Sequence, residues 1–155
     1  MFDSALSRYA WERAMTRKEA FKALVLGIEI ELTRYHELKA LLERQYVAAM
    51  RRDATGIERI AQSILTLVDT LAEHHELRRI HACILAAPSA PASMMDVLDC
   101  IAGAPRERLM TIWSQLETLV RECKTLNARN GQLLVAQFEV VQRALYGETH
   151  IYAET

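Results

Sequence analysis

The sequence predicts an all-α protein, an elongated antiparallel helical bundle made of a long helical hairpin with a short extra helix. Leu, Ala, Glu and Arg dominate, and the 155 residues include only 5 glycines and 3 prolines. Most positions therefore carry residues that lose little side-chain freedom in a helix. Apolar residues also recur every three or four positions through three long segments, which is the spacing of one helix face.

The composition limits the size and the class of the protein. A chain of 155 residues fits one domain, and 51% apolar with 25% charged residues is close to the average of soluble globular proteins. The net charge is −1, and the basic residues are scattered. They form neither the positive stripe that binds nucleic acid nor a basic face for anionic lipid, so we expect neither partner.

The location follows from what the sequence lacks. No apolar run approaches the roughly 20 residues of a membrane span, and the amino end lacks the pattern of a secretory signal. Cys83, Cys100 and Cys123 are odd in number and form no CxxC pair, so we interpret them as reduced core thiols. We therefore expect a cytoplasmic protein.

The first long helix is predicted between Lys18 and Arg51. At about 1.5 Å per residue it is a rod of roughly 50 Å. The segment Asp3 to Thr16 either extends this rod or folds back as a short helix. Apolar residues mark one side of the rod, at Phe21, Val25, Ile28, Leu32, Tyr35, Leu38, Leu42, Tyr46 and Ala49.

The second long helix begins after a short polar turn at residues 51–56, where Asp53 or Thr55 is suited to cap it. So short a turn predicts antiparallel packing. After Leu71 the apolar face moves about half a turn round the helix. The seam positions become His74, Arg78 and His81, and the apolar residues become Leu77, Ile80 and Ile84. Either the helix breaks near His74, or another element or chain covers its last turns from a different side; we favour the second interpretation.

The end of the second helix is marked by a loop at residues 86–92, because its two prolines cannot continue a helix. Ser93 and Asp96 have the spacing of a capping box, which predicts a short helix through Ile101 that Gly103 terminates. Pro105 suits the first position of the last helix. The apolar pattern of that helix ends at Gly147, so we assign residues 1–146 to one domain and 147–155 to a flexible tail.

The pair Asn130-Gly131 is a turn signal between strands, but here the helical phase continues across it from Leu126 to Leu134. We therefore expect a continuous helix, in which the glycine allows another backbone to come close. Asn127 and Asn130 are either exposed residues or buried amides that fix the register of the helices. We favour a role in register or at an interface.

No pattern in the sequence indicates catalysis, a cofactor or a metal. Phosphate loops, HExxH and GxSxG are absent, and no histidine follows a glutamate by three residues as in helical di-iron sites. The densest polar cluster runs from Glu73 to His81, and we interpret it as a solvated face or a polar interface. A phosphotransfer histidine is the enzymatic alternative, although the Lys and Gly that generally follow such a histidine are missing.

The segment from Leu126 to Leu134 reads Leu-Asn-Ala-Arg-Asn-Gly-Gln-Leu-Leu. It resembles the FlgN family of flagellar export chaperones, whose last helix carries Leu-Asn-x-x-Asn-Gly-x-Leu and is followed by a tyrosine in a loose tail. The order of parts is also similar, with a long first helix that contains Leu41-Leu42-Glu43-Arg44, a short turn, a second long helix, a variable middle and the Asn-Gly helix.

The resemblance implies a cytoplasmic chaperone, without catalysis, that binds hook-filament junction (hook-associated) proteins and delivers them to the flagellar type III export gate. It also implies partner contacts in the C-terminal region, and Tyr152 matches the tyrosine linked to the gate. The glycine that often follows that tyrosine is absent, so we expect cargo to use the helical body more. The expected partner-binding residues are Asn127, Asn130, Gly131, Leu134, Phe138, Ile151 and Tyr152.

The alternative is a helical adaptor or regulatory protein without catalysis, which forms a homodimer through the shifted face of the second helix.

Overall fold

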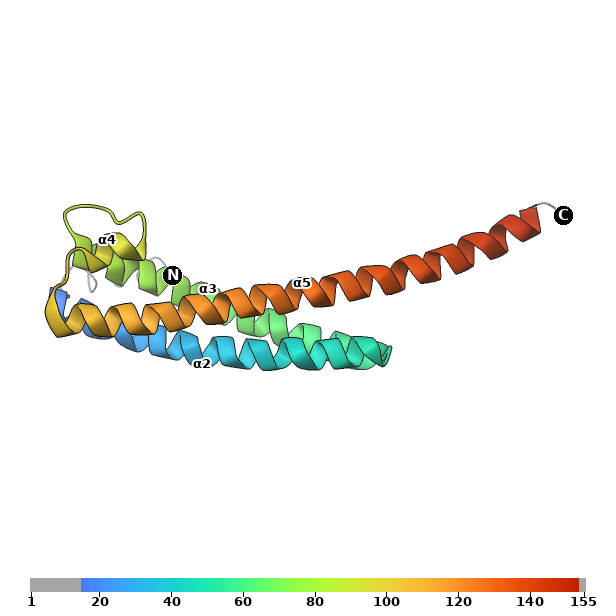
Figure 1. Ribbon diagram of the computed structural model, residues 1–155, viewed down its shortest axis with the longest axis horizontal. Coiled ribbons are helices and arrows are strands. Elements are labelled where there is room, and N and C mark those ends of the chain that lie inside the picture. The colour runs from blue at the N-terminus through green and yellow to red at the C-terminus, as the bar shows by residue number, and fades with distance from the viewer. Residues whose placement is uncertain (1–14, 154–155) are drawn as a thin grey trace, which may run out of the picture.

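A computed structural model of the chain describes the backbone of residues 15–153 and the side chains of residues 15–145. These residues form four helices, labelled in Figure 1: α2 (Arg17–Met50), α3 (Ala54–Ala86), α4 (Met94–Leu98) and α5 (Gly103–Ala153). The described residues include no strand. The predicted all-α class, with a long hairpin and one short extra helix, is confirmed.

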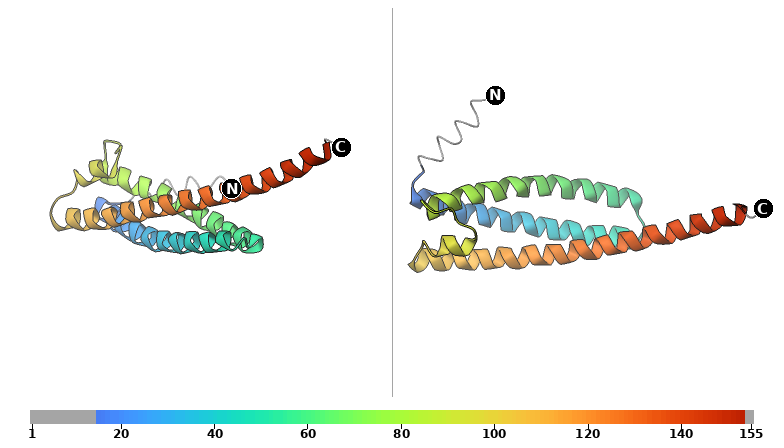
Figure 2. Two further views of the ribbon diagram at one scale, coloured as in Figure 1. Left: turned by 45° about the vertical axis from the view of Figure 1, so that its right-hand side comes forward. Right: turned by 90° about the horizontal axis from the view of Figure 1, so that it is seen from above.

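The three long helices do not pack equally against one another. α2 and α3 form the antiparallel hairpin, and α5 runs beside α2 in the same direction as α2 (Figures 1 and 2). α2 packs along both α3 and α5, whereas α3 and α5 do not pack backbone to backbone. α4 contacts both α3 and α5 at one end of the molecule. α2 is therefore the central helix of the bundle.

The core lies where the inward faces of these helices meet, and the predicted apolar seams supply most of it. Each fully buried leucine or isoleucine contributes roughly 1.5–3 kcal/mol relative to an exposed one. The core includes Leu24, Ile28, Leu38 and Leu42 of α2, Leu67, Leu71 and Leu85 of α3, Val97 and Leu98 of α4, and Leu109, Leu116, Leu119 and Cys123 of α5.

Capping residues fix where the first two helices begin. Thr16 has an extended backbone (φ −73°, ψ 161°), and its Oγ1 accepts a hydrogen bond from the Glu19 amide at 3.1 Å. α2 therefore begins at Arg17. Whether the segment Asp3 to Thr16 extends the rod or folds back lies outside the described residues, apart from Met15 and Thr16. At α3 the cap is Asp53, whose Oδ1 accepts from the Gly56 amide at 3.0 Å.

Two predicted helix ends differ from the structure. The short helix stops at Leu98 rather than continuing through Ile101, and Gly103, expected to terminate it, is instead the first residue of α5. Gly103 has φ +70°, a left-handed conformation that glycine adopts without strain, so it turns the chain into α5. The backbone of α5 also remains helical past Gly147, because one interior glycine costs only about 1 kcal/mol.

Three hydrogen bonds fix the register of α5 on α2. The side chains of Cys123, Asn130 and Gln137 donate to the carbonyl oxygens of Tyr35, Leu42 and Ala49, at 3.5, 2.7 and 2.8 Å. Each pair is separated by 88 positions along the chain. Donors and acceptors both recur every seven residues. This is the heptad repeat of two helices that pack side by side along one face. We call these bonds the register ladder.

Asn130 is the best-buried member of this ladder. Its side chain is 1% exposed, and its Nδ2 also donates to Gln45 Oε1 at 2.9 Å. Its neighbour Arg129 pairs with Glu43 at 3.2 Å and stacks 3.7 Å above the ring of Tyr46. The Asn-Gly segment is therefore a continuous helix, as expected, and Asn130 has a packing role in it.

Replacing Asn130 with alanine is expected to lower the free energy of unfolding by about 1–3 kcal/mol, because the half-buried Gln45 amide loses its partner. Chemical denaturation followed by circular dichroism measures this change. Asn127→Ala is the matched control: Asn127 is exposed on the same helix, so its loss is expected to stay within about 0.5 kcal/mol. Equal effects of the two variants would contradict a register role for Asn130.

Candidate functional site

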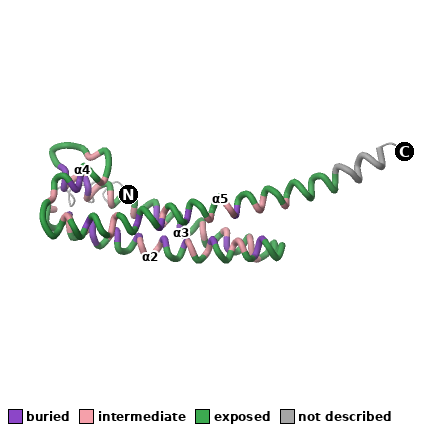
Figure 3. The backbone as a smooth tube through the Cα atoms, viewed as in Figure 1, coloured by how far each residue is buried: buried purple, intermediate pink, exposed green. Residues whose placement is uncertain are grey.

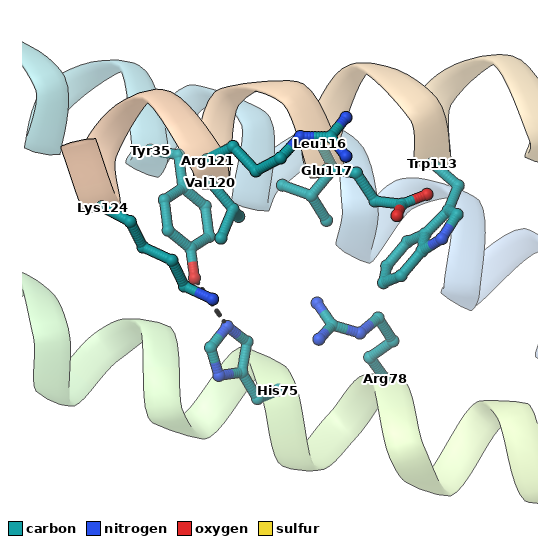
Figure 4. Close-up of a pocket in the computed structure, with 9 residues that line it drawn as sticks. All are labelled: Tyr35, His75, Arg78, Trp113, Leu116, Glu117, Val120, Arg121 and Lys124. Atoms are coloured by element: carbon teal, nitrogen blue, oxygen red, sulfur yellow. Dashed lines mark hydrogen bonds between the residues drawn. The ribbon is translucent and has the colours of Figure 1, made fainter. Parts of the chain in front are cut away.

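A partly polar cavity lies between α3 and α5. In a four-helix bundle, each helix contacts two neighbours and lies diagonally opposite the third. α2 has its two neighbours here. Among the described residues, only α4 occupies the position that would touch both α3 and α5, and it does so at one end. A cavity of about 390 Å³ marks this position, which we call the fourth corner (Figure 4). It is lined by Tyr35, His75, Arg78, Trp113, Leu116, Glu117, Val120, Arg121 and Lys124.

The floor of the fourth corner rests on a buried ion pair. Glu31 of α2 is 0% exposed, and Arg78 Nη1 of α3 lies 2.6 and 2.5 Å from its two carboxylate oxygens. The guanidinium also lies 5.1 Å from the ring centroid of Trp113 on α5, a cation–π distance. One arginine therefore links all three long helices.

This ion pair explains why the apolar face of α3 shifts. Arg78 occupies an inward seam position because Glu31 occupies the facing seam position of α2. Leu77 is then turned outward, with 42% of its surface exposed. α3 is continuous from Ala54 to Ala86, so the interpretation that the helix breaks near His74 is excluded.

Tyr35 and His75 form the second polar contact of the floor, with the phenol oxygen 3.0 Å from Nε2 (Figure 4). Burial, and then the nearby Glu31 carboxylate, raise the pKa of the phenol, so the hydroxyl keeps its proton. Burial, and then the Arg78 charge, lower the pKa of the imidazole. The lowered pKa favours the neutral form of the His75 ring, although Glu31 lies 3.6 Å from Nε2 and acts in the opposite direction.

The rim of the fourth corner is basic. Arg121 and Lys124 are exposed on α5, and within the described residues neither side chain has an ion pair or hydrogen bond. Glu117 is the one carboxylate among the lining residues. Since Glu31 neutralises Arg78, the two α5 cations decide the sign of this surface.

The side of α5 that faces the fourth corner continues along the helix. Trp113, Glu117, Val120, Lys124, Asn127 and Gly131 follow one another at steps of three or four, which places them on one face. A Cβ atom built on Gly131 would meet nothing within 4 Å. Asn127 and Gly131 of the Asn-Gly segment therefore lie on an open surface, whereas Asn130 faces α2.

Beyond the hairpin, no other helix of residues 15–153 lies beside α5. Gln137 makes the last bond to α2, at Ala49, and α5 then projects past the α2–α3 turn (Figures 1 and 3). We call residues 138–153 the overhang. It carries large apolar side chains that are more than half exposed, and Val135 just before it belongs to the same group. The exposed fractions are 57% for Val135, 62% for Phe138, 56% for Val140, 55% for Val141 and 56% for Leu145.

The predicted partner-binding residues fall into three groups. Asn127, Gly131 and Phe138 are exposed and Leu134 is half-buried on α5, whereas Asn130 is buried against α2. Ile151 and Tyr152 belong to the α5 backbone, but their side chains lie outside the described residues.

Sequence reasoning missed two parts of the site. Val135, Val140 and Val141 are exposed but were not among the predicted partner-binding residues. The signal was the length of the last predicted helix, whose apolar pattern is much longer than that of the first helix and therefore extends beyond it. The ion pair was also missed. Its signal was a charged residue at a seam position of each hairpin helix, Glu31 and Arg78.

Neither a metal site nor a membrane span is found in the described part of the chain. No group of three or more His, Cys, Asp or Glu side chains there is placed to hold a metal ion. None of its helices is long and apolar enough to cross a membrane. The arrangement offers surfaces for binding.

The chain was compared with known protein families, curated proteins and solved structures. Residues 15–146 match the model of a protein family described as FlgN protein. No curated protein and no solved structure matches the chain.

Arg78→Leu is expected to lower the free energy of unfolding by about 3–5 kcal/mol, because it leaves the Glu31 carboxylate buried without a partner. Glu31→Leu combined with Arg78→Leu should recover most of this loss, since no buried charge remains. Urea denaturation at neutral pH measures both. The control is Arg108→Leu, which removes an exposed pair with Glu29 and is expected to cost less than about 1 kcal/mol. A double variant as unstable as Arg78→Leu would refute this account.

Proposed function

Because the chain belongs to the FlgN family of flagellar export chaperones, we propose that it binds hook-filament junction (hook-associated) proteins in the cytoplasm and delivers them to the flagellar type III export gate. The observation that supports this most directly is the overhang, where α5 exposes Phe138 and Val141 and no other described helix lies beside it. Exposed apolar patches of this kind mark sites of protein interaction.

The chemistry of such a cargo suits this surface. Export substrates of this class have disordered ends that become apolar helices when they assemble. An exposed helix face can bury such an end and so block early assembly reversibly. This function requires no catalysis, and the interaction can be released at the export gate. The predicted contacts Asn127, Gly131, Leu134 and Phe138 lie along the half of α5 that leads into the overhang.

A homodimeric adaptor remains the second candidate, because the hairpin exposes another apolar face. Leu26 and Ile30 of α2 are 58% and 37% exposed, and with Leu77 of α3 they line a shallow groove. In the adaptor hypothesis this groove is the dimer interface. The two hypotheses therefore differ in the mass of the protein in solution.

Phe138→Asp combined with Val141→Asp is expected to abolish the complex with the junction proteins while leaving the chaperone folded. Both side chains are mostly exposed, so each substitution should change stability by no more than about 0.5 kcal/mol. Size-exclusion chromatography with light scattering, on mixtures with each purified junction protein, measures complex mass.

The matched control is Gln132→Asp with Ala136→Asp, which adds the same charge at two exposed positions of the same helix. Their spacing from Phe138 and Val141 places them on the opposite side of α5. The control should keep the complex. If wild-type protein binds neither junction protein and elutes as a dimer, the chaperone proposal fails and the adaptor hypothesis replaces it.

Tyr152→Ala is expected to keep the cargo complex and to reduce secretion of the junction proteins severalfold, since we propose that Tyr152 contacts the export gate. Tyr152→Phe keeps the ring and tests whether the hydroxyl matters. Secretion into the medium by flagellated cells is the readout, with complex formation measured in parallel. Normal secretion by the alanine variant would remove Tyr152 from the gate contact.

A further inference from the structure

We propose that the fourth corner is the docking site for one amphipathic helix of the exported partner. The apolar side of that helix enters the corner, and an acidic edge lies along α5, so the bound partner completes a four-helix bundle. This inference rests on the proposed function, because the partner is the cargo protein. It adds a second contact surface to the overhang and specifies the chemistry that fits it.

The first argument is the arrangement of the helices. α2 packs on α3 and α5, while α3 and α5 stand diagonally across from each other, as in a four-helix bundle that lacks one member. α4 contacts both diagonal helices, so it already occupies the start of the missing position. Its 5 residues cover only about 8 Å of that position. No described residue fills the remaining length, which offers a position for one further helix.

The second argument is the apolar strip at the base of the corner. Trp113 and Val120 are half-buried, and Leu116 lies between them in the lining. Trp113 and Val120 are seven positions apart and share one face of α5, so they present apolar surface to an incoming helix, with the buried Leu116 beneath them. The Trp113 ring is held in place by Arg78, whose own position is fixed by the buried Glu31 carboxylate. The apolar surface is therefore preorganised.

The third argument is charge. Arg121 and Lys124 lie on the α5 side of the corner and make no ion pair within the described residues. A helix with carboxylates along one edge would pair with both cations as its apolar face is buried. The chain's own first 14 residues carry Asp3 and Glu12 against Arg8 and Arg13, so they provide no net acidic edge. An acidic helix of the partner fits this rim better.

The fourth argument is continuity with the Asn-Gly segment. Asn127 and Gly131 follow Val120 and Lys124 on the same face of α5, and the space above Gly131 is empty. A glycine at this position allows the backbone of a docked helix to approach α5 closely. The same face then reaches Phe138 at the start of the overhang. One helical segment of the partner can therefore run from the corner to the overhang.

The first test is a substitution that fills the space above Gly131 and leaves the fold unchanged. Gly131→Leu should leave the free protein at least as stable, because leucine favours helix more than glycine does and nothing lies within 4 Å. The affinity for a purified junction protein, measured by titration calorimetry on the full chain, should fall at least tenfold. Gly27→Leu is the matched control, since Gly27 is also helical and also has nothing within 4 Å, but it lies on α2 outside the corner, in the groove of the adaptor hypothesis. It should bind like wild type.

The charge argument has its own test. Arg121→Glu with Lys124→Glu should weaken cargo binding at least tenfold at low salt, and the deficit should shrink in 0.5 M salt as ion pairs are screened (Debye length about 4–5 Å). Lys18→Glu with Lys22→Glu makes the same change of charge on exposed positions of α2 and should keep near-wild-type affinity. Equal losses in both double variants would overturn the proposal.

A photoreactive residue in place of Ala128, which is exposed on the same side of α5 as Arg121 and Lys124, identifies the occupant. Crosslinks to an acidic helical segment of the junction protein support the proposal. Crosslinks only to residues 1–14 or to a second copy overturn it.

If the corner variants bind like wild type while Phe138→Asp with Val141→Asp does not, this inference fails and the proposed function stands. If wild-type protein binds no junction protein, both fail.

Discussion

The register ladder between α2 and α5 determines the shape of the whole molecule. Its constant separation of 88 residues places Phe138 opposite Met50, the last residue of α2. Because α5 is 51 residues long and α2 only 34, everything after Phe138 has to extend beyond the bundle. A shift of the ladder by one heptad would bury or expose a further two turns of α5. The length of the overhang is therefore a consequence of three hydrogen bonds.

The buried polar groups have a related role on the other side of α2. Leucines alone would allow the hairpin helices to slide, since one apolar seam residue replaces another at little cost. The Glu31–Arg78 pair forms in only one alignment of α2 and α3, and Trp113 extends that alignment to α5. Such a pair is weak support for stability, but a wrong alignment would leave a charge buried without a partner. Polar contacts thus specify both interfaces of the central helix.

The helices and most of the core were predictable from the sequence because apolar spacing reports directly which face of a helix is buried. The seam from Ile28 to Leu42 is one example. The helix ends at Ile101 and Gly147 were less predictable, since capping depends on local backbone geometry. The site was predictable only in part. Asn127, Gly131 and Phe138 were selected, but the fourth corner depends on which helices are neighbours, and spacing within one helix does not contain that information.

The two open surfaces are consistent with a protein whose bundle is completed by its partner. Residues 138–145 are exposed among the described residues, so this extension of α5 depends mainly on intrinsic helix propensity. A cargo helix that runs from the fourth corner onto this segment would supply the missing apolar contacts to both helices at once. Ordering the cargo helix and residues 138–145 would then cost part of the binding free energy, which lowers the affinity for a given buried area. A delivery chaperone benefits from this balance, because a large and selective surface can still release its cargo.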